Sequence, residues 1–216
     1  MKTFRLSLIL LLLTSVAAIA CAPTEDTLPE DEYPQAPEEN EHSNEEDTDT
    51  SKTGSWPETQ ETTIMLEGME ESFTLHLFED ADSFITYVPE DLIPEVSDND
   101  TTYTFYANFG NNKNEEVYLE IKLPYDITQG ETLEHDGIQL TKVDDNQHIH
   151  SWSLAEYQNT DDNDYSIYAS LGNHNGGKFI MITHYPVEFS DGFGPRAATI
   201  IEHFYWMDSD EYLVEQ

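Results

Sequence analysis

The sequence predicts an α+β fold in which a mostly antiparallel β-sheet packs against one C-terminal helix. Apolar and polar side chains alternate in several runs between residues 63 and 185, which is the period of half-buried strands. Short turn-like segments separate these runs, and near the end of the chain the apolar spacing becomes helical. Strands that are covered on one face by a helix form an α+β architecture.

Two pairs of the expected strands form hairpins. Glu67-Gly68 separates the first pair, and residues 173–177 join the second. The segment Phe179–Ile182 is apolar on both faces, so its strand is expected at the centre of the sheet. The strands predicted from alternation are Thr63–Leu66, Phe73–Phe78, Tyr103–Phe109, Val117–Leu123, Tyr165–Leu171 and Lys178–Tyr185.

One long helix is expected close to the C-terminus. Asp191 and Pro195 are residue types that open helices. A second, shorter helix fits between residues 127 and 140, although Gly130 and Gly137 disfavour it. The C-terminal helix is expected to bury one apolar face, formed by Ala197, Ile200, Ile201 and Phe204.

The first twenty residues have the pattern of a secretory signal peptide. Lys2 and Arg5 precede the apolar run Leu8–Leu13, and small residues lead to Ala20. The apolar run is too short to span a bilayer, which takes roughly 20 apolar residues. Residues 1–20 are therefore predicted to be a signal peptide.

The next residue is the only cysteine of the chain. The run Ala18-Ile19-Ala20-Cys21 resembles the lipobox of bacterial lipoproteins, with Ala18 where leucine is usual. The resemblance implies a diacylglyceryl group on Cys21 that anchors the chain to the extracytoplasmic face of the cell membrane. Two acyl chains suit stable anchoring, because one chain binds only marginally. The alternative is an incidental thiol after an ordinary cleavage site.

Residues 21–60 are rich in acids and proline and poor in aliphatic residues. Such a composition cannot bury enough apolar surface to offset chain entropy, and like charges extend it. We expect a disordered acidic tether here, followed by a single domain over residues 61–216. Trp56 belongs either to the tether or to the surface of that domain.

The chain carries 45 acids against 8 bases, a net charge of -37. Nucleic acids and anionic lipid headgroups repel such a surface, so neither is an expected partner. Three interpretations of the acidity stay open: a saline or alkaline habitat, cation binding, or a basic partner.

An oxygen-rich loop offers candidate calcium ligands in Asp161, Asp162 and Asp164. The loop does not fit an EF-hand, because Ile167 stands where glycine is required and Asn173 where the bidentate glutamate belongs. A solvated acidic turn is the simpler interpretation.

His148 and His150 are candidate zinc or copper ligands. On a strand, residues two apart point to one face, so the two imidazoles would lie side by side. A third ligand such as His174, His184 or a carboxylate would have to come from elsewhere. Ordinary surface or half-buried histidines, and a pair that titrates near neutral pH, are the alternatives.

The segment Tyr87, Pro89 and Leu92 resembles an aromatic and proline element of the PsbP/Mog1-like domains. The early hairpin and the closing strand, loop and helix over residues 179–206 add to this resemblance. It implies accessory or partner-binding roles and no shared catalytic site. The domain is also similar to those of lipoproteins of Gram-positive bacilli.

Hydrolase signatures such as Gly-x-Ser-x-Gly and His-Glu-x-x-His do not occur in the sequence. The leading hypothesis is a non-enzymatic accessory lipoprotein that binds an envelope protein or ligand. The alternative is a metal-dependent extracytoplasmic enzyme that uses His148 and His150 with carboxylates. A third possibility is a domain that only decorates the cell surface.

Overall fold

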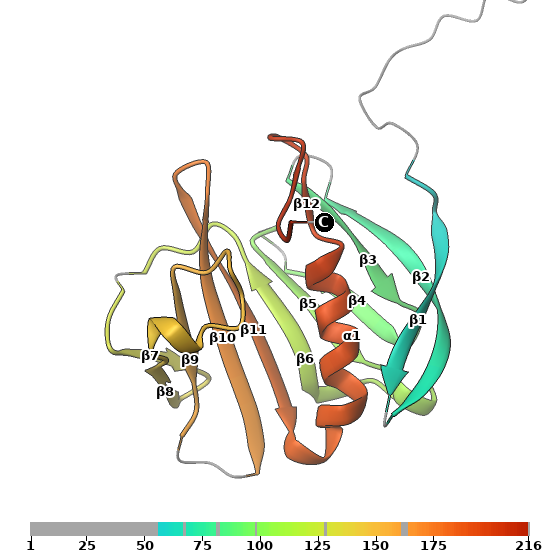
Figure 1. Cartoon of the computed structure of the whole chain (residues 1–216), viewed down its shortest axis with the longest axis horizontal. Coiled ribbons are helices and arrows are strands. Elements are labelled where there is room, and N and C mark those ends of the chain that lie inside the picture. The colour runs from blue at the N-terminus through green and yellow to red at the C-terminus, as the bar shows by residue number, and fades with distance from the viewer. Residues whose placement is uncertain are drawn as a thin grey trace, which may run out of the picture. The chain divides into compact units, whose positions relative to one another are not determined.

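A computed structural model describes residues 56–66, 68–80, 83–97, 99–127, 129–160 and 164–215 (Figure 1). All of them belong to one compact unit of the chain, residues 50–216. Cys21, the predicted signal peptide and most of the predicted tether lie outside the described residues, as do Asp161 and Asp162. Within the described ranges, no helix is long and apolar enough to span a membrane.

The strands form two antiparallel sheets. The five-stranded sheet has the order β1 (Thr59–Leu66), β2 (Met69–Asp80), β3 (Phe84–Pro89), β12 (Tyr205–Trp206) and β13 (Glu211–Tyr212). The eight-stranded sheet has the order β4 (Leu92–Val96), β5 (Thr102–Ala107), β6 (Asn114–Lys122), β11 (Gly177–Pro186), β10 (Tyr165–His174), β9 (Ala155–Gln158), β8 (Ile138–Lys142) and β7 (Thr132–His135).

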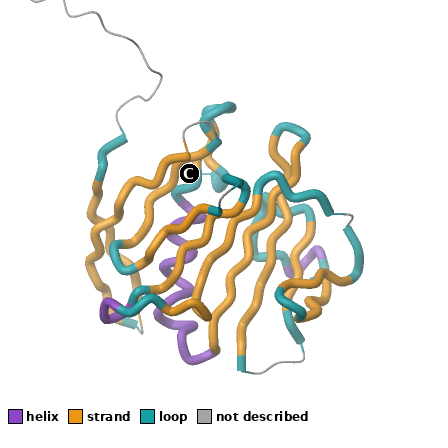
Figure 2. Tube along the Cα trace, turned by 180° about the vertical axis from the view of Figure 1, so that it is seen from behind, coloured by secondary structure: helices purple, strands orange, loops and turns teal. Residues whose placement is uncertain are grey.

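One α-helix, α1 (Ser190–Glu202), packs on one face of the strands and contacts β1, β3, β6 and β11. Figure 1 shows it in front of the sheets, and Figure 2, from the opposite side, shows it behind them. The predicted α+β class, with mostly antiparallel strands and a C-terminal helix, is confirmed at this level. Three short 3-10 turns complete the described elements: η1 (Phe109–Asn111), η2 (Asp145–Gln147) and η3 (Val187–Phe189).

The predicted central strand is confirmed, since β11 lies between β6 and β10. Phe179 and Met181 face the core that includes α1, whereas Ile180 and Ile182 face a second apolar cluster on the other side. Both predicted hairpins are also confirmed, as β1–β2 and β10–β11.

Helix α1 is tied to the strands by polar contacts as well as by its apolar face. Thr86 Oγ1, on β3, donates a 2.6 Å hydrogen bond to the carbonyl of Ile200. Arg196 forms a 2.6 Å ion pair with Asp91. Helix α1 begins at Ser190, directly after η3 ends. Pro195 lies inside the helix, so the expectation that it opens the helix is wrong.

The expected short helix between residues 127 and 140 is wrong. This segment contains β7 and β8, joined by a two-residue turn at Asp136 and Gly137 with φ values of 50° and 79°. An Asp-Gly pair favours a hairpin turn in which both residues have positive φ, and a helix excludes that conformation. Leu133 and Leu140 from the two strands pack into the second apolar cluster.

Trp56 packs on the five-stranded sheet. Its ring centroid lies 5.1 Å from that of Tyr205 and 6.1 Å from that of Tyr212. Tyr87 lies 6.4 Å away and donates a 2.8 Å hydrogen bond to the carbonyl of Pro57. The question that the sequence leaves open is thus decided: Trp56 lies on the folded unit.

Candidate functional site

A pocket of about 370 Å³ lies where the tip of the β10–β11 hairpin approaches the C-terminal β12–β13 turn. Figure 1 shows both tips at the same end of the unit. The loop before β5 and the loop after β6 complete the wall. We call this the hairpin pocket; its lining includes Asp100, Leu123, His174, Lys178, Trp206 and Asp208.

A histidine–aspartate pair closes one side of the hairpin pocket. His174 Nε2 donates a 2.6 Å hydrogen bond to Asp208 Oδ1, and Asn175 donates one of 2.7 Å to Oδ2. The hydrogen bond from His174, helped by that from Asn175, holds the pKa of Asp208 below its ordinary value. The His174 ring also stacks on Trp206, with centroids 3.9 Å apart and planes 3° from parallel. The pair is therefore fixed in place by both sheets.

Lys178 differs from every other base in the described part of the chain. Its ammonium donates a 2.6 Å hydrogen bond to the carbonyl of Ile127, and no described carboxylate lies within 4.0 Å of it. Each of the other described bases has a carboxylate partner: Lys113 with Glu95, Lys122 with Glu120, Lys142 with Asp145 and Arg196 with Asp91. In so acidic a chain, a cation without a carboxylate partner is a candidate binding group.

Asp100 stands at the rim of the same pocket. It has a positive φ of 52°, and its backbone N–H donates a 2.9 Å hydrogen bond to Ser97. Its carbonyl accepts a 3.0 Å hydrogen bond from the hydroxyl of Tyr103. The backbone of this residue is therefore held at both ends, while its side chain is exposed and has no described base within 4.0 Å.

A row of five rings packs in and next to the wall of the pocket. Consecutive centroids in this aromatic row are 5.0, 5.4, 5.1 and 3.9 Å apart. Phe179 lies over Gly172, where a β-carbon would come within 2.2 Å of the ring. The row consists, in order, of His150, Trp152, Phe179, Trp206 and His174.

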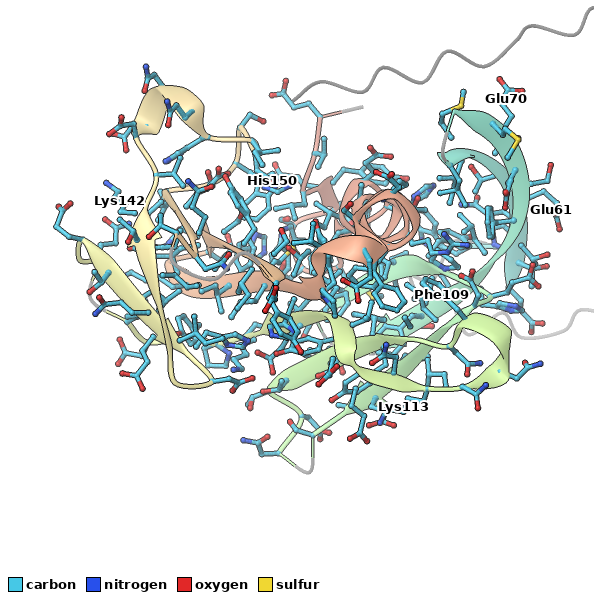
Figure 3. The ribbon with its side chains drawn as sticks, turned by 90° about the horizontal axis from the view of Figure 1, so that it is seen from below. Glu61, Glu70, Phe109, Lys113, Lys142 and His150 are labelled. Atoms are coloured by element: carbon cyan, nitrogen blue, oxygen red, sulfur yellow. The ribbon has the colours of Figure 1, made fainter. Side chains whose placement is uncertain are left out.

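His148 and His150 lie in the loop between η2 and β9 and not on a strand. Figure 3 shows His150 between the β7–β8 end, marked by Lys142, and helix α1. The Nδ1 atom of His148 lies 3.2 Å from the hydroxyl of Ser153. Among the described residues, no group of three histidine, aspartate, glutamate or cysteine side chains is placed to hold a metal ion.

The other suggested ligands lie in separate places. His174 belongs to the hairpin pocket, and His184 stacks on Tyr118 at a centroid distance of 4.9 Å. Of the acidic loop only Asp164 is described, and its carbonyl accepts a hydrogen bond from the N–H of Val187.

The loop that carries His148 and His150 is held by a carboxylate that sequence reasoning missed. Glu156 is fully buried and accepts hydrogen bonds from the N–H groups of Ile149 and His150, at 2.7 and 2.8 Å. The hydroxyls of Ser153 and Tyr168 donate to the same carboxylate. Burial alone would raise the pKa of Glu156, but these hydrogen bonds outweigh it and lower the pKa.

His150 does not form a catalytic relay with this carboxylate. Its Nδ1 atom lies 3.0 Å from the hydroxyl of Ser170 and 3.4 Å from Glu156. A serine–histidine–acid relay uses the two different ring nitrogens, one for the hydroxyl and one for the acid. Here both partners meet the same nitrogen, so the arrangement anchors the loop. An isolated glutamate in a short strand gave no signal that could have identified this role.

No known protein family, no curated protein sequence and no solved structure matches this chain.

Proposed function

We propose that this chain is a membrane-anchored extracytoplasmic lipoprotein whose folded unit binds a small polar ligand in the hairpin pocket. The observation that carries the proposal is the placement of Lys178, a base without a described carboxylate partner, in a pocket of about 370 Å³. A pocket with a few converging polar groups on an apolar wall is the usual form of a ligand site.

The side chains in the walls of the pocket are held in place, which favours ligand binding over catalysis by a group that has to move. His174 is held by its hydrogen bond to Asp208 and by its stacking on Trp206. A preformed site loses little free energy in ordering its side chains when a ligand binds. This suits an accessory role of the kind that the PsbP/Mog1-like resemblance implies, displayed outside the cell by the lipid on Cys21 and the acidic tether.

The proposal is tested on the lipidated chain purified from membranes in detergent. Thermal unfolding is measured against a library of small polar metabolites, for the wild type, for Lys178→Met and for Lys142→Met. Lys142 is the matched control, because it is a lysine outside the pocket that pairs with Asp145 at 3.3 Å. We expect at least one ligand to raise the melting temperature of the wild type and of Lys142→Met but not of Lys178→Met.

An absence of such ligands, or an equal response of the two variants, contradicts the binding proposal. The anchoring is checked in the same preparation. The Cys21→Ser chain is expected in the culture medium without lipid label, and its retention in the membrane fraction contradicts the anchor.

A further inference from the structure

We infer that the ligand of the hairpin pocket is a small zwitterion, of the size of an amino acid or a dipeptide, with a free ammonium and a free carboxylate. This inference rests on the proposed function and names the ligand class of the same site.

The first pole is Lys178. An ammonium has three N–H donors, and one of them is used by the carbonyl of Ile127 at 2.6 Å. The remaining donors face no described carboxylate within 4.0 Å. A carboxylate from the ligand would give Lys178 the charge-assisted hydrogen bond that the other described bases obtain from the protein.

The second pole is Asp100. The carboxylate of Asp208 already accepts a hydrogen bond on each oxygen, from His174 and from Asn175, and these bonds hold it against the wall of the pocket. Asp100 lines the same pocket, comes from the loop before β5, and has no described base within 4.0 Å. A ligand ammonium would pair with it. The pocket thus presents an ammonium and a carboxylate that have no described partner of opposite charge within 4.0 Å.

The apolar wall separates this ligand class from sugars. Leu123 and Pro124 offer aliphatic contact next to the charged groups. A sugar ring packs on an open aromatic face, but one face of Trp206 is covered by His174, with ring centroids 3.9 Å apart, and the residue is only 6% exposed. The wall suits a small aliphatic side chain better than a flat polar ring.

The charge of the chain disfavours simpler ions as ligands. At a net charge of -37, the long-range field repels a phosphate or a dicarboxylate. A plain amine is attracted by that field but leaves Lys178 without a partner. A zwitterion has no net charge, so it avoids the repulsion and still satisfies both poles.

The test is titration calorimetry on the lipidated chain in detergent. The probes are the common amino acids, alanyl-alanine, and the same dipeptide with its amine acetylated or its carboxylate converted to the amide. We expect the free zwitterions to bind, and blocking either end to weaken binding by about tenfold or more, since each block removes a charge-assisted hydrogen bond.

Variants of the pocket test which protein group binds the ligand carboxylate and which binds the ligand ammonium. Lys178→Met is expected to bind the free acid and the amide equally, and Asp100→Asn to bind the free amine and the acetylated dipeptide equally. Lys142→Met and Asp144→Asn, outside the pocket, are the matched controls and are expected to keep both discriminations. If Lys178→Met does not fold, Lys178→Gln keeps a hydrogen-bond donor toward Ile127 while removing the charge.

The outcomes separate the two proposals. If zwitterions and their blocked forms bind equally, or if only another class of polar ligand depends on Lys178, the zwitterion inference is overturned and the binding module stands. If no ligand of any class depends on Lys178, both are overturned.

Discussion

Gly172 is the residue on which the back wall of the hairpin pocket depends. It pairs with Phe179 across the β10–β11 hairpin, and the Phe179 ring lies directly over it. A β-carbon at this position would lie 2.2 Å from the ring carbon Cζ, which is far inside van der Waals contact. The absence of a side chain therefore lets Phe179 pack between Trp152 and Trp206.

Gly172→Ala is expected to lower the free energy of unfolding by roughly 1–3 kcal/mol, the usual cost of overpacking a core. Urea denaturation of the full chain measures it. The control is Gly194→Ala in helix α1, where nothing lies within 4 Å of the added β-carbon. That variant is expected to gain about 0.5–1 kcal/mol from helix propensity. Equal effects of the two substitutions would contradict the packing argument.

At the scale of elements, one buried histidine, His135, and one half-buried histidine, His150, make the folded state sensitive to pH. Burial lowers the pKa of His150 in the loop after η2, against the opposing effect of the Glu156 carboxylate. Burial also lowers the pKa of His135 at the end of β7, against Asp136 and Glu120. Both side chains are therefore held neutral in the folded state more strongly than in the unfolded chain, whose histidine pKa is 6.5.

The sign of the pH effect follows from proton binding. Below pH 6.5 the unfolded chain binds more protons at these two positions, so their contribution to stability is present above that pH and is lost as the pH falls. We expect the double variant His135→Gln, His150→Gln to lose less stability than the wild type between about pH 7.5 and 5.5. Urea denaturation at constant ionic strength measures the difference; parallel curves, or a steeper loss in the double variant, contradict it.

At the scale of the whole molecule, the net charge of -37 is the dominant feature. Carboxylates far outnumber the bases that pair with them, so mutual repulsion destabilises the compact state. Salt screens charges that lie further apart than the Debye length, which is about 10 Å at 0.1 M ionic strength.

Sodium chloride is therefore expected to raise the melting temperature steadily from about 0.05 M to about 1 M. Calcium chloride at matched ionic strength is the control that separates screening from cation binding. Equal effects of the two salts support the habitat interpretation of the acidity. A rise that saturates at micromolar calcium, with little effect of sodium, contradicts screening and favours a specific cation site.

Local patterns in the sequence predicted helix α1 and six of the thirteen strands in the described residues. Alternation identified both hairpins and the doubly apolar β11, because residues two apart in a strand always share a face. Helical spacing identified α1, because residues three or four apart in a helix share a face. The Asp136-Gly137 turn was missed, although an Asp-Gly pair is a local hairpin signal, because the apolar spacing around it also fits a helix.

The hairpin pocket was decided only by the tertiary structure. Asp100, Lys178 and Asp208 are far apart in the sequence but line one pocket. The sheet order β5–β6–β11 brings the loop before β5 near the start of β11, and His174 on the β10–β11 hairpin bonds Asp208 in the C-terminal turn. Whether a base finds a carboxylate depends on which strands become neighbours, and no local spacing encodes that. The sequence by itself determined the β1–β2 and β10–β11 hairpins, helix α1 and the charge of this protein. The packing of distant strands decided which charges stay available for a ligand.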